Sequence, residues 1–285
     1  LPGGGRLAVP LARCAMEGEA ARGVVVKDGG DDPDATHGAE VHAVVRITGP
    51  GEGLRLDGGR GVGRVTRPGL EVPPGQAAIN PGPQRQIRAA VVEVLEACGA
   101  DAGSGIGTGP GIAVVIEVPD GEAIAERTLN PRLGIVGGIS ILGSNGIVRP
   151  YSHDAWKAAV AQGLDVARAA GLEQVLFATG RRSERLYCEH FPQVPEAARI
   201  QPADFFAFAM REAAHRGFAR VVWTLFPGKL AKHAQGLEHT HAHTAPLDLD
   251  RLAAEARAAG ADDHAASMVE QAATVRGALE GLEPY

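Results

Sequence analysis

The sequence predicts a mixed α+β protein, with an N-terminal αβ domain on a mixed sheet and a C-terminal α/β region of βαβ character. Three observations support this class. Strand-like segments in the first half are separated by turns rich in glycine and proline, the second half alternates strand-like and helix-like segments, and the pattern changes near residue 150. We therefore expect two domains, residues 1–150 and 151–285.

Alternation and β-branched residues predict the strands, and apolar residues spaced three and four apart predict the helices. The first domain is expected to hold strands 22–26, 40–48 and 112–118, helices 84–98 and 121–128, and ordered loop over 58–83. The apolar face of the first of these helices consists of Ile87, Val91, Val94, Leu95 and Cys98. The second domain is expected to hold helix 152–170, strand 174–179, helix 203–216, strand 219–226 and helices near 229–236, 249–259 and 264–280. This alternation favours parallel strands.

Composition narrows the function classes. Hydrophobic residues make up 45% and charged residues 22% of the 285 residues, which is typical of a folded globular protein. The net charge of −6 argues against nucleic-acid and membrane-surface roles, which favour a basic face. Three widely spaced cysteines, Cys14, Cys98 and Cys188, form neither a disulfide framework nor a CxxC pair, so we expect a cytoplasmic protein. The opening residues suggest a turn before a strand rather than a targeting segment.

An acidic loop is the first candidate for chemistry. Residues 27–38, KDGGDDPDATHG, place four carboxylates, one lysine and one histidine directly after a predicted strand. Such a cluster is suited to general acid–base catalysis or to a divalent metal ion. A solvated turn is the alternative, because aspartate, proline and glycine are the residues that turns use.

A glycine-rich stretch, residues 134–146, is the second candidate. Its five glycines punctuate an apolar run, so its backbone can approach a ligand or another strand closely. Free N–H groups there could hold a carboxylate or a ribose, although the order of a dinucleotide fingerprint is absent. Close strand packing is an equally weighted alternative. Asn130 and Arg132 precede the stretch and add a candidate grip for a carboxylate.

Two further motifs lie in the second half. His239, His241 and His243 have a spacing that can ligate zinc, but a polar loop with one functional histidine is the favoured interpretation. Thr179 and Gly180 follow a predicted strand, where ligands bind in open α/β sheets, and the same argument applies to residues 226–229. The sequence contains no GxSxG, Walker or HExxH motif.

Taken in order, several segments resemble the cobalt-precorrin-5B C(1)-methyltransferase family of anaerobic cobalamin biosynthesis. The resemblance runs from about residue 22 to residue 241 and rests on VVVKDGGDDPDATHGAE, GRGVGRVTRPGL, AAINPGP, TLNPRLGIVGGISILGSNGIVRPYS, FATG and GKLAKHAQGLEHTH. The sequence begins where the family's second strand is expected, without the usual glycine–threonine–threonine–glycine turn and alanine-rich helix.

The resemblance implies transfer of a methyl group from S-adenosylmethionine to carbon 1 of a ring-contracted cobalt corrinoid. The cobalt enters as part of the substrate, so no metal site is expected in the protein. The substrate's acetate and propionate groups make it polyanionic, and basic residues in the matched motifs become candidate clamps for these carboxylates.

Within this resemblance, three residues are assigned acid–base or orienting roles: Asp31, Asp32 and His37. The residues assigned to the methyl donor are Gly137, Gly138, Ser140, Gly143, Thr179 and Gly180. Those assigned to the corrinoid are Lys27, Arg64, Arg67, Asn130, Arg132 and His241, with Arg149, Lys229 and Lys232 as further basic candidates. No nucleic acid or membrane partner is expected, and self-association is left open.

Two other function classes compete with the methyltransferase. A non-catalytic corrinoid- or tetrapyrrole-binding protein would keep the substrate pocket without the donor site. A metal-dependent hydrolase would use Asp31, Asp32 and His37 as its centre.

Overall fold

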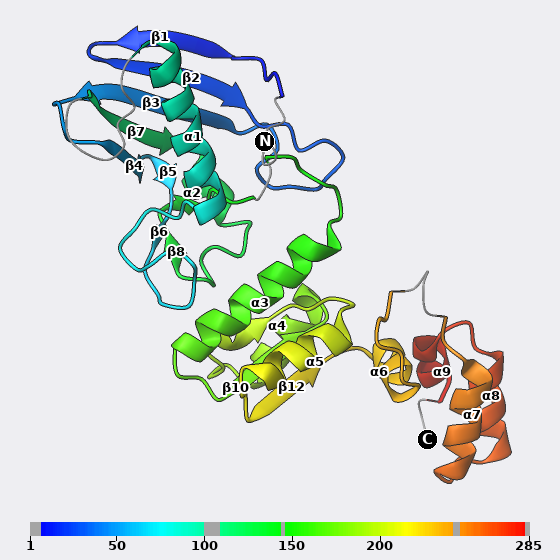
Figure 1. Cartoon of the computed structure of the whole chain (residues 1–285). Helices are drawn as coiled ribbons and strands as arrows, with labels where there is room; N and C mark the ends of the chain where they lie inside the picture. Colours follow the sequence, from blue (N-terminus) through cyan, green and yellow to red (C-terminus); the bar gives the residue numbers. More distant parts are fainter. Residues whose placement is uncertain (1–6, 100–108, 144–145, 242–245, 283–285) are drawn as a thin grey trace. The chain divides into compact units, whose positions relative to one another are not determined.

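The computed structural model describes residues 7–99, 109–143, 146–241 and 246–282 (Figure 1). The chain forms two compact units, Leu1–His153 and Asp154–Tyr285. The first unit combines a mixed sheet with helices, and the second combines a parallel sheet with helices. This confirms the predicted mixed α+β class.

A five-stranded sheet forms the body of the first unit, in the order β1-β2-β3-β7-β4. Its strands are β1 Arg13–Glu17, β2 Ala20–Val26, β3 Glu40–Thr48, β4 Leu54–Gly58 and β7 Gly111–Glu117. Neighbours pair antiparallel, except that β4 runs parallel to β7. The sheet is therefore mixed, as the sequence predicts, and the acidic loop connects β2 to β3.

Helix α1, Pro81–Ala97, packs on one face of this sheet (Figure 1). Ile87, Val91 and Leu95 contact the core, because residues four apart lie on the same face of a helix. Val94 was expected on this face but is exposed. It lies about 100° around the helix from Leu95, outside the row that contacts the sheet. Cys98 follows the helix and is also exposed.

Two short strand pairs of the first unit join the segment predicted as loop, residues 58–83, to the glycine-rich stretch. Strand β5 Gly61–Val62 pairs in parallel with β9 Gly138–Ile139, and β6 Arg64–Val65 pairs antiparallel with β8 Ile135–Val136. Helix α2, Gly121–Ala125, contacts β5 and β9. These pairings bring the glycine-rich stretch against residues 61–65.

The second unit contains a parallel sheet in the order β11-β10-β12, which confirms the predicted βαβ character. Its strands are β10 Gln174–Ala178, β11 Arg199–Ile200 and β12 Arg220–Thr224, and its first helices are α3 His153–Ala169, α4 Arg181–His190 and α5 Phe206–His215. A single turn of 3-10 helix, Glu196–Ala198, precedes β11. The core includes Leu164, Phe177 and Ala209, none of which is exposed.

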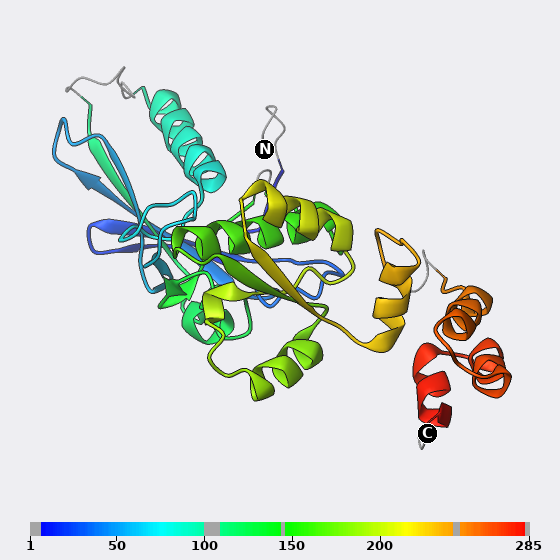
Figure 2. The same ribbon diagram turned by 90° about the horizontal axis from the view of Figure 1, so that it is seen from below.

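The described part of the second unit contains four further helices: α6 Pro227–Ala234, α7 Leu249–Ala258, α8 Asp263–Gln271 and α9 Val275–Leu282. Figure 2 shows the last three as separate rods, coloured orange to red. The single helix predicted over 264–280 is therefore wrong. Ala272 is extended, with φ −70° and ψ 146°, and the Thr274 hydroxyl accepts a hydrogen bond from the Gly277 amide at 3.0 Å. That bond caps a new helix.

Candidate functional site

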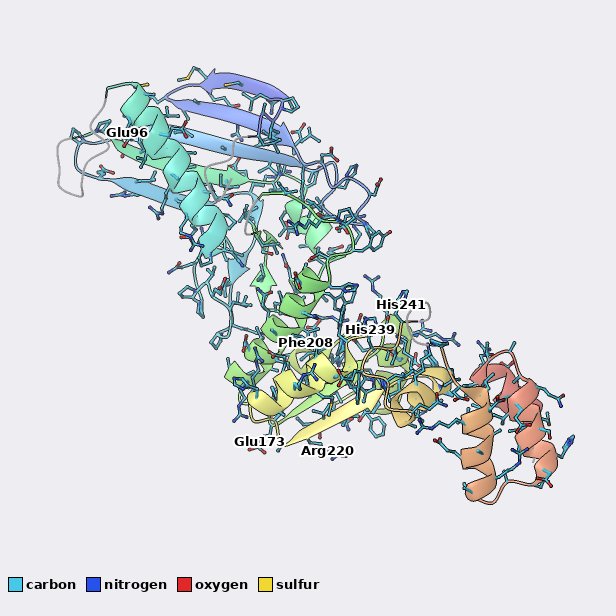
Figure 3. The ribbon with its side chains drawn as sticks, turned by 45° about the vertical axis from the view of Figure 1, so that its right-hand side comes forward. Glu96, Glu173, Phe208, Arg220, His239 and His241 are labelled. Atoms are coloured by element: carbon cyan, nitrogen blue, oxygen red, sulfur yellow. The ribbon has the colours of Figure 1, made fainter. Side chains whose placement is uncertain are left out.

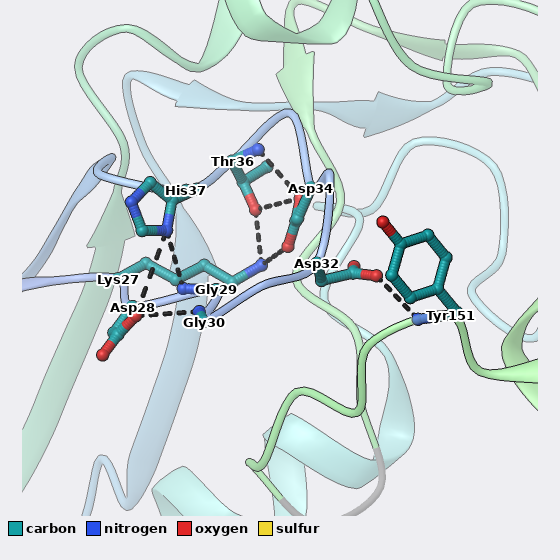
Figure 4. A network of polar contacts seen from close by, with 9 residues as sticks. All are labelled: Lys27, Asp28, Gly29, Gly30, Asp32, Asp34, Thr36, His37 and Tyr151. Carbon is teal, nitrogen blue, oxygen red and sulfur yellow. Dashed lines mark hydrogen bonds and ion pairs between the residues drawn. The ribbon is translucent and has the colours of Figure 1, made fainter.

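The acidic loop is closed at its base by backbone hydrogen bonds. The Lys27 amide donates to the Ala39 carbonyl at 2.9 Å, and the Gly38 amide donates to the Lys27 carbonyl at 2.8 Å. Figure 4 shows the side chains that the loop then arranges. The loop is an ordered extension of the β2–β3 hairpin with its own polar network.

One end of this network joins Lys27, Asp34 and Thr36. Lys27 Nζ donates to Asp34 Oδ2 and to Thr36 Oγ1, while the Thr36 amide and hydroxyl donate to Asp34 Oδ1 at 2.8 and 2.7 Å. Partial burial of the Asp34 carboxyl acts to raise its pKa, but the hydrogen bonds from Lys27 and Thr36 outweigh it and the pKa lies below its ordinary value. Lys27, predicted to contact substrate, has a partner inside the loop.

His37 is held by the backbone of the same loop. Its Nδ1 accepts a hydrogen bond from the Gly29 amide at 3.0 Å, and Asp28 Oδ1 lies 4.0 Å from the same nitrogen (Figure 4). Asp28 in turn accepts from the Gly30 amide at 2.8 Å. Because Nδ1 is the acceptor, the neutral ring carries its proton on Nε2. Nε2 is therefore the nitrogen that can donate a proton outside the loop.

Asp32 points to a different part of the unit. Its Oδ1 accepts a hydrogen bond from the Tyr151 amide at 2.9 Å, and Tyr151 has a left-handed backbone, φ 54°, that is uncommon outside glycine. Figure 4 places Asp32 and His37 on different sides of the loop, and Asp31 is exposed. The three residues assigned to acid–base chemistry therefore lie in one loop without converging on one point in this conformation.

In the glycine-rich stretch, Gly138 is required by strand packing. A Cβ atom at Gly138 would lie 2.1 Å from the Gly61 carbonyl oxygen and 2.8 Å from the Gly63 amide nitrogen. Gly137 and Gly143 differ, because both are exposed, have positive φ angles and border open space. The close-packing alternative thus accounts for Gly138, and the two exposed glycines are left as candidates for a ligand.

The side chains of Asn130 and Ser140 form hydrogen bonds that hold the glycine-rich stretch in place. Asn130 is 7% exposed, its side-chain nitrogen donates to the Gly138 carbonyl at 3.4 Å, and its side-chain oxygen accepts from the Ser140 hydroxyl at 3.2 Å. The contacts point inward to the protein. They favour a positioning role for both residues over direct binding of a ligand.

Two of the predicted basic clamps in the first unit, Arg64 and Arg67, also have protein partners. Arg64 donates from Nη2 to both carboxylate oxygens of Asp57, at 3.1 and 3.0 Å. The side chain of Arg67 covers Gly134, where an added Cβ would lie 2.7 Å from Arg67 Cγ, and its Nη1 lies 3.5 Å from the Arg132 carbonyl. Arg149 is exposed.

In the second unit, Thr179 and Gly180 follow β10 at the carboxyl edge of the parallel sheet. The Ser183 hydroxyl bridges this turn, lying 3.3 Å from the Gly180 amide and 3.3 Å from the Thr179 hydroxyl. A Cβ at Gly180 would meet no atom within 4 Å, so open space borders the turn. This is the edge at which ligands bind in open α/β sheets.

Asp204, which the sequence analysis missed, organises the same edge after β11. It accepts hydrogen bonds from Lys229 Nζ at 2.6 Å and from the Thr240 hydroxyl at 2.8 Å. Partial burial acts to raise the pKa of Asp204, but these two bonds outweigh it and lower that pKa. Asp204 lies four residues after β11, a two-residue strand that the sequence pattern did not predict, so the rule that pointed to Thr179 gave no signal for Asp204.

The histidine motif lies next to this carboxylate. His239 packs edge-on against Phe205 with ring centroids 5.2 Å apart, and His241 lies 6.3 Å from His239 (Figure 3). His241 is exposed, and His243 lies outside the described residues. His233, also missed, stacks on Phe206 at 4.0 Å, and burial lowers the pKa of His233. Histidines on this segment thus have distinct environments rather than one shared centre.

Comparison with known proteins identifies the family. A model of the CbiD family matches residues 1–150, and a model described as the CbiD C-terminal domain matches residues 239–284. The chain belongs to the CbiD family. The predicted resemblance to cobalt-precorrin-5B C(1)-methyltransferases is confirmed.

CbiD relatives match nearly the whole chain. A cobalt-precorrin-5B C(1)-methyltransferase of Nitratidesulfovibrio vulgaris is 55% identical, over 98% of this chain and 70% of the relative. Proteins of that name from Geobacillus kaustophilus and Salinispora arenicola are 47% and 45% identical, over 96% and 98% of this chain and 71% of each relative. A crystal structure of cobalamin biosynthesis protein CbiD from Archaeoglobus fulgidus is 25% identical, covers 87% of this chain and 70% of its own, and has a TM-score of 0.35.

No three histidine, cysteine, aspartate or glutamate side chains in the described ranges form a group suited to a metal ion. Within those ranges, no helix combines the length and apolar content of a membrane span.

Proposed function

We propose that this CbiD chain transfers a methyl group from S-adenosylmethionine to carbon 1 of cobalt-precorrin-5B, giving cobalt-precorrin-6A in cobalamin biosynthesis. The observation that carries the proposal is the 55% identity over 98% of the chain to a relative named for this methylation. Seven further relatives with the same name are 42–47% identical. The cobalt is part of the substrate.

The donor supplies a methyl group on a sulfonium sulfur. The bond between methyl carbon and sulfur breaks as the new carbon–carbon bond forms, and the sulfur keeps the electron pair. The residues of the protein hold donor and acceptor in line, and such positioning is worth up to about 7–11 kcal/mol in well-oriented reactions.

The carboxyl edge of the parallel sheet fits the donor best. Thr179 and Gly180 border open space after β10, and the Gly180 backbone is extended, with φ 174°. Gly137 and Gly143 remain candidates for binding the donor. Gly138 does not, because backbone atoms of the neighbouring strand already lie beside it. Ser140 acts through Asn130, as a positioning residue for the glycine-rich stretch.

The acidic loop of the first unit is proposed to act on the corrinoid. His37 presents Nε2 as its proton-carrying nitrogen, and Asp32 holds the Tyr151 amide through one oxygen while the other is available. These groups suit an orienting role or movement of a proton during methylation. Arg132 and His241 are retained as candidates for the corrinoid's carboxylates.

The direct test is incubation of the chain with cobalt-precorrin-5B and S-adenosylmethionine labelled in the methyl group. We expect a corrinoid product heavier by one labelled methyl and an equal amount of S-adenosylhomocysteine. An unchanged corrinoid mass would refute the proposal.

A non-catalytic corrinoid carrier is the alternative function, and it would bind the corrinoid without the methyl donor. Calorimetry with S-adenosylhomocysteine separates the two functions. The methyltransferase should bind this product of the donor, and a carrier should not.

A further inference from the structure

A cavity of about 320 Å³ lies in the first unit beside α1, away from the residues assigned to catalysis. Strands β4 and β6, residues 75–79 and the first turns of α1 form its walls. Its polar side chains are Asp57, Arg64, Gln76, Gln84 and Arg88. The volume is at the lower end of the range for small-molecule sites, about 300–1,000 Å³, so the cavity admits part of a large ligand rather than a macrocycle.

Arg64 and Asp57 neutralise each other at one wall of this cavity. Arg64 Nη2 contacts both Asp57 oxygens at 3.1 and 3.0 Å, and Arg64 Nη1 donates to the Gly75 carbonyl at 3.3 Å. Asp57 also accepts from the Gly58 amide at 2.8 Å. The pair is therefore a fixed part of the wall, with little net charge.

Arg88 is the cavity's second guanidinium, and it has no such counter-charge. Its Nη1 donates to the Leu54 carbonyl at 3.1 Å, which fixes the side chain against β4. In the part of the chain that the structure describes, no carboxylate lies within ion-pairing distance of Arg88. A guanidinium has five N–H donors, so most of those on Arg88 are available to a ligand.

Nearby amide side chains add neutral hydrogen-bonding capacity. Gln84 Nε2 donates to the Ile79 carbonyl at 2.7 Å, which orients the Gln84 side chain at the start of α1. Gln76 also lines the cavity. The cavity thus offers one uncompensated, backbone-anchored guanidinium flanked by amides, an arrangement that matches a planar carboxylate.

We propose that this cavity binds a carboxylate group of one of the two small molecules in the proposed reaction, with Arg88 as its direct ligand. The inference rests on the proposed function for the identity of those molecules. Two sources have the required chemistry: an acetate or propionate arm of the corrinoid, and the α-carboxylate of the methyl donor.

The test compares Arg88→Gln with Arg85→Gln in the full chain. Arg85 and Arg88 are both exposed on the same helix, and of the two only Arg88 lines the cavity. Each variant loses one positive charge. The probes are cobyrinic acid, which carries free acetate and propionate groups, its methyl ester, which lacks carboxylates, and S-adenosylhomocysteine. Calorimetry measures affinity, and circular dichroism verifies that each variant is folded.

We expect Arg88→Gln to weaken binding of one carboxylate probe by about tenfold or more relative to Arg85→Gln, because the variant loses a charge-assisted hydrogen bond to the probe. Weaker binding of cobyrinic acid, with binding of its ester unchanged, assigns the cavity to the corrinoid. Weaker binding of S-adenosylhomocysteine assigns it to the donor. Equal affinities of the two variants for both acids overturn the proposal, even where methyl transfer itself is observed. If Arg88→Gln selectively loses affinity for a carboxylate probe but the wild-type chain transfers no methyl group, the carboxylate site is supported and the proposed function is rejected.

Discussion

Asp34 and Asp32 lie two residues apart in the acidic loop, yet their contacts give them different roles. Asp34 accepts from Lys27 and from two groups of Thr36, so its charge is committed to holding the loop. Asp32 accepts from a single backbone amide, that of Tyr151, in the described structure. Substitution of Asp34 is expected to affect stability, and substitution of Asp32 is expected to affect turnover.

Asp34→Asn should therefore lower the free energy of unfolding by about 1 kcal/mol at pH 7, a value reduced by partial solvent exposure of the ion pair. Because folding lowers the pKa of Asp34, its contribution is complete above the ordinary value of 3.8 and is lost as the pH falls through the lower, folded-state value. Urea unfolding at pH 7 and about pH 3 should show the difference between wild type and variant shrinking in acid. Asp31→Asn, at an exposed position, is the control and should change little.

Asp32→Asn should lower kcat by about a hundredfold while the protein stays folded. The amide oxygen can still accept from Tyr151, so the variant removes the charge and keeps the contact. Steady-state kinetics with the corrinoid measures the effect. Asp120→Asn, an exposed carboxylate after β7, is the matched control. Equal kcat values for Asp32→Asn and wild type would remove Asp32 from the catalytic residues.

At the scale of elements, periodicity predicted the strands and helices whose apolar residues repeat. It failed where polar contacts determine whether a helix forms or where it begins. Helix α4 was missed because RRSERLYCEH has no apolar stripe, and its buried residues are Ser183 and Glu184. The break between α8 and α9 was missed because Ala272 and Thr274 fit a continuing helix. The Thr274 hydroxyl instead caps α9, a local bond that residue spacing does not reveal.

The pairing of β5 with β9 depends on a glycine where two backbones meet. Gly138→Ala would place a Cβ 2.1 Å from the Gly61 carbonyl oxygen. Relieving this clash requires moving the backbone, which costs more than moving a flexible side chain. We expect a loss of about 2–3 kcal/mol or more in the free energy of unfolding, measured by urea denaturation. Gly180→Ala, with extended backbone and open space, should change stability by less than about 0.5 kcal/mol. Comparable losses in both variants would contradict this assignment.

At the scale of the whole molecule, motif order along the chain predicted the family, but it did not predict which residues face a ligand. Arg64 and Lys27 were assigned to substrate from their charge and their place in the matched motifs, and the structure pairs them with Asp57 and Asp34. Asp204 and Arg88 were overlooked because neither belongs to a recognisable motif. Whether a charge is free or compensated depends on contacts between distant segments, such as that of Arg88 with Leu54, which a single sequence does not specify.

Removal of metal ions separates the methyltransferase from the metal-dependent hydrolase built on Asp31, Asp32 and His37. The single lone pair of His37 Nδ1 already accepts from the Gly29 amide, so metal binding by this nitrogen would require breaking that bond. Asp32 would contribute the oxygen that does not accept from the Tyr151 amide. The cobalt of the proposed reaction enters inside the corrinoid, beyond the reach of a mild chelator. Dialysis against EDTA should therefore leave the rate of methyl transfer, followed by labelled product, within about twofold of the untreated rate, a difference of roughly 0.4 kcal/mol in barrier. A rate abolished by EDTA and restored by added zinc or magnesium would instead make the acidic loop a metal centre.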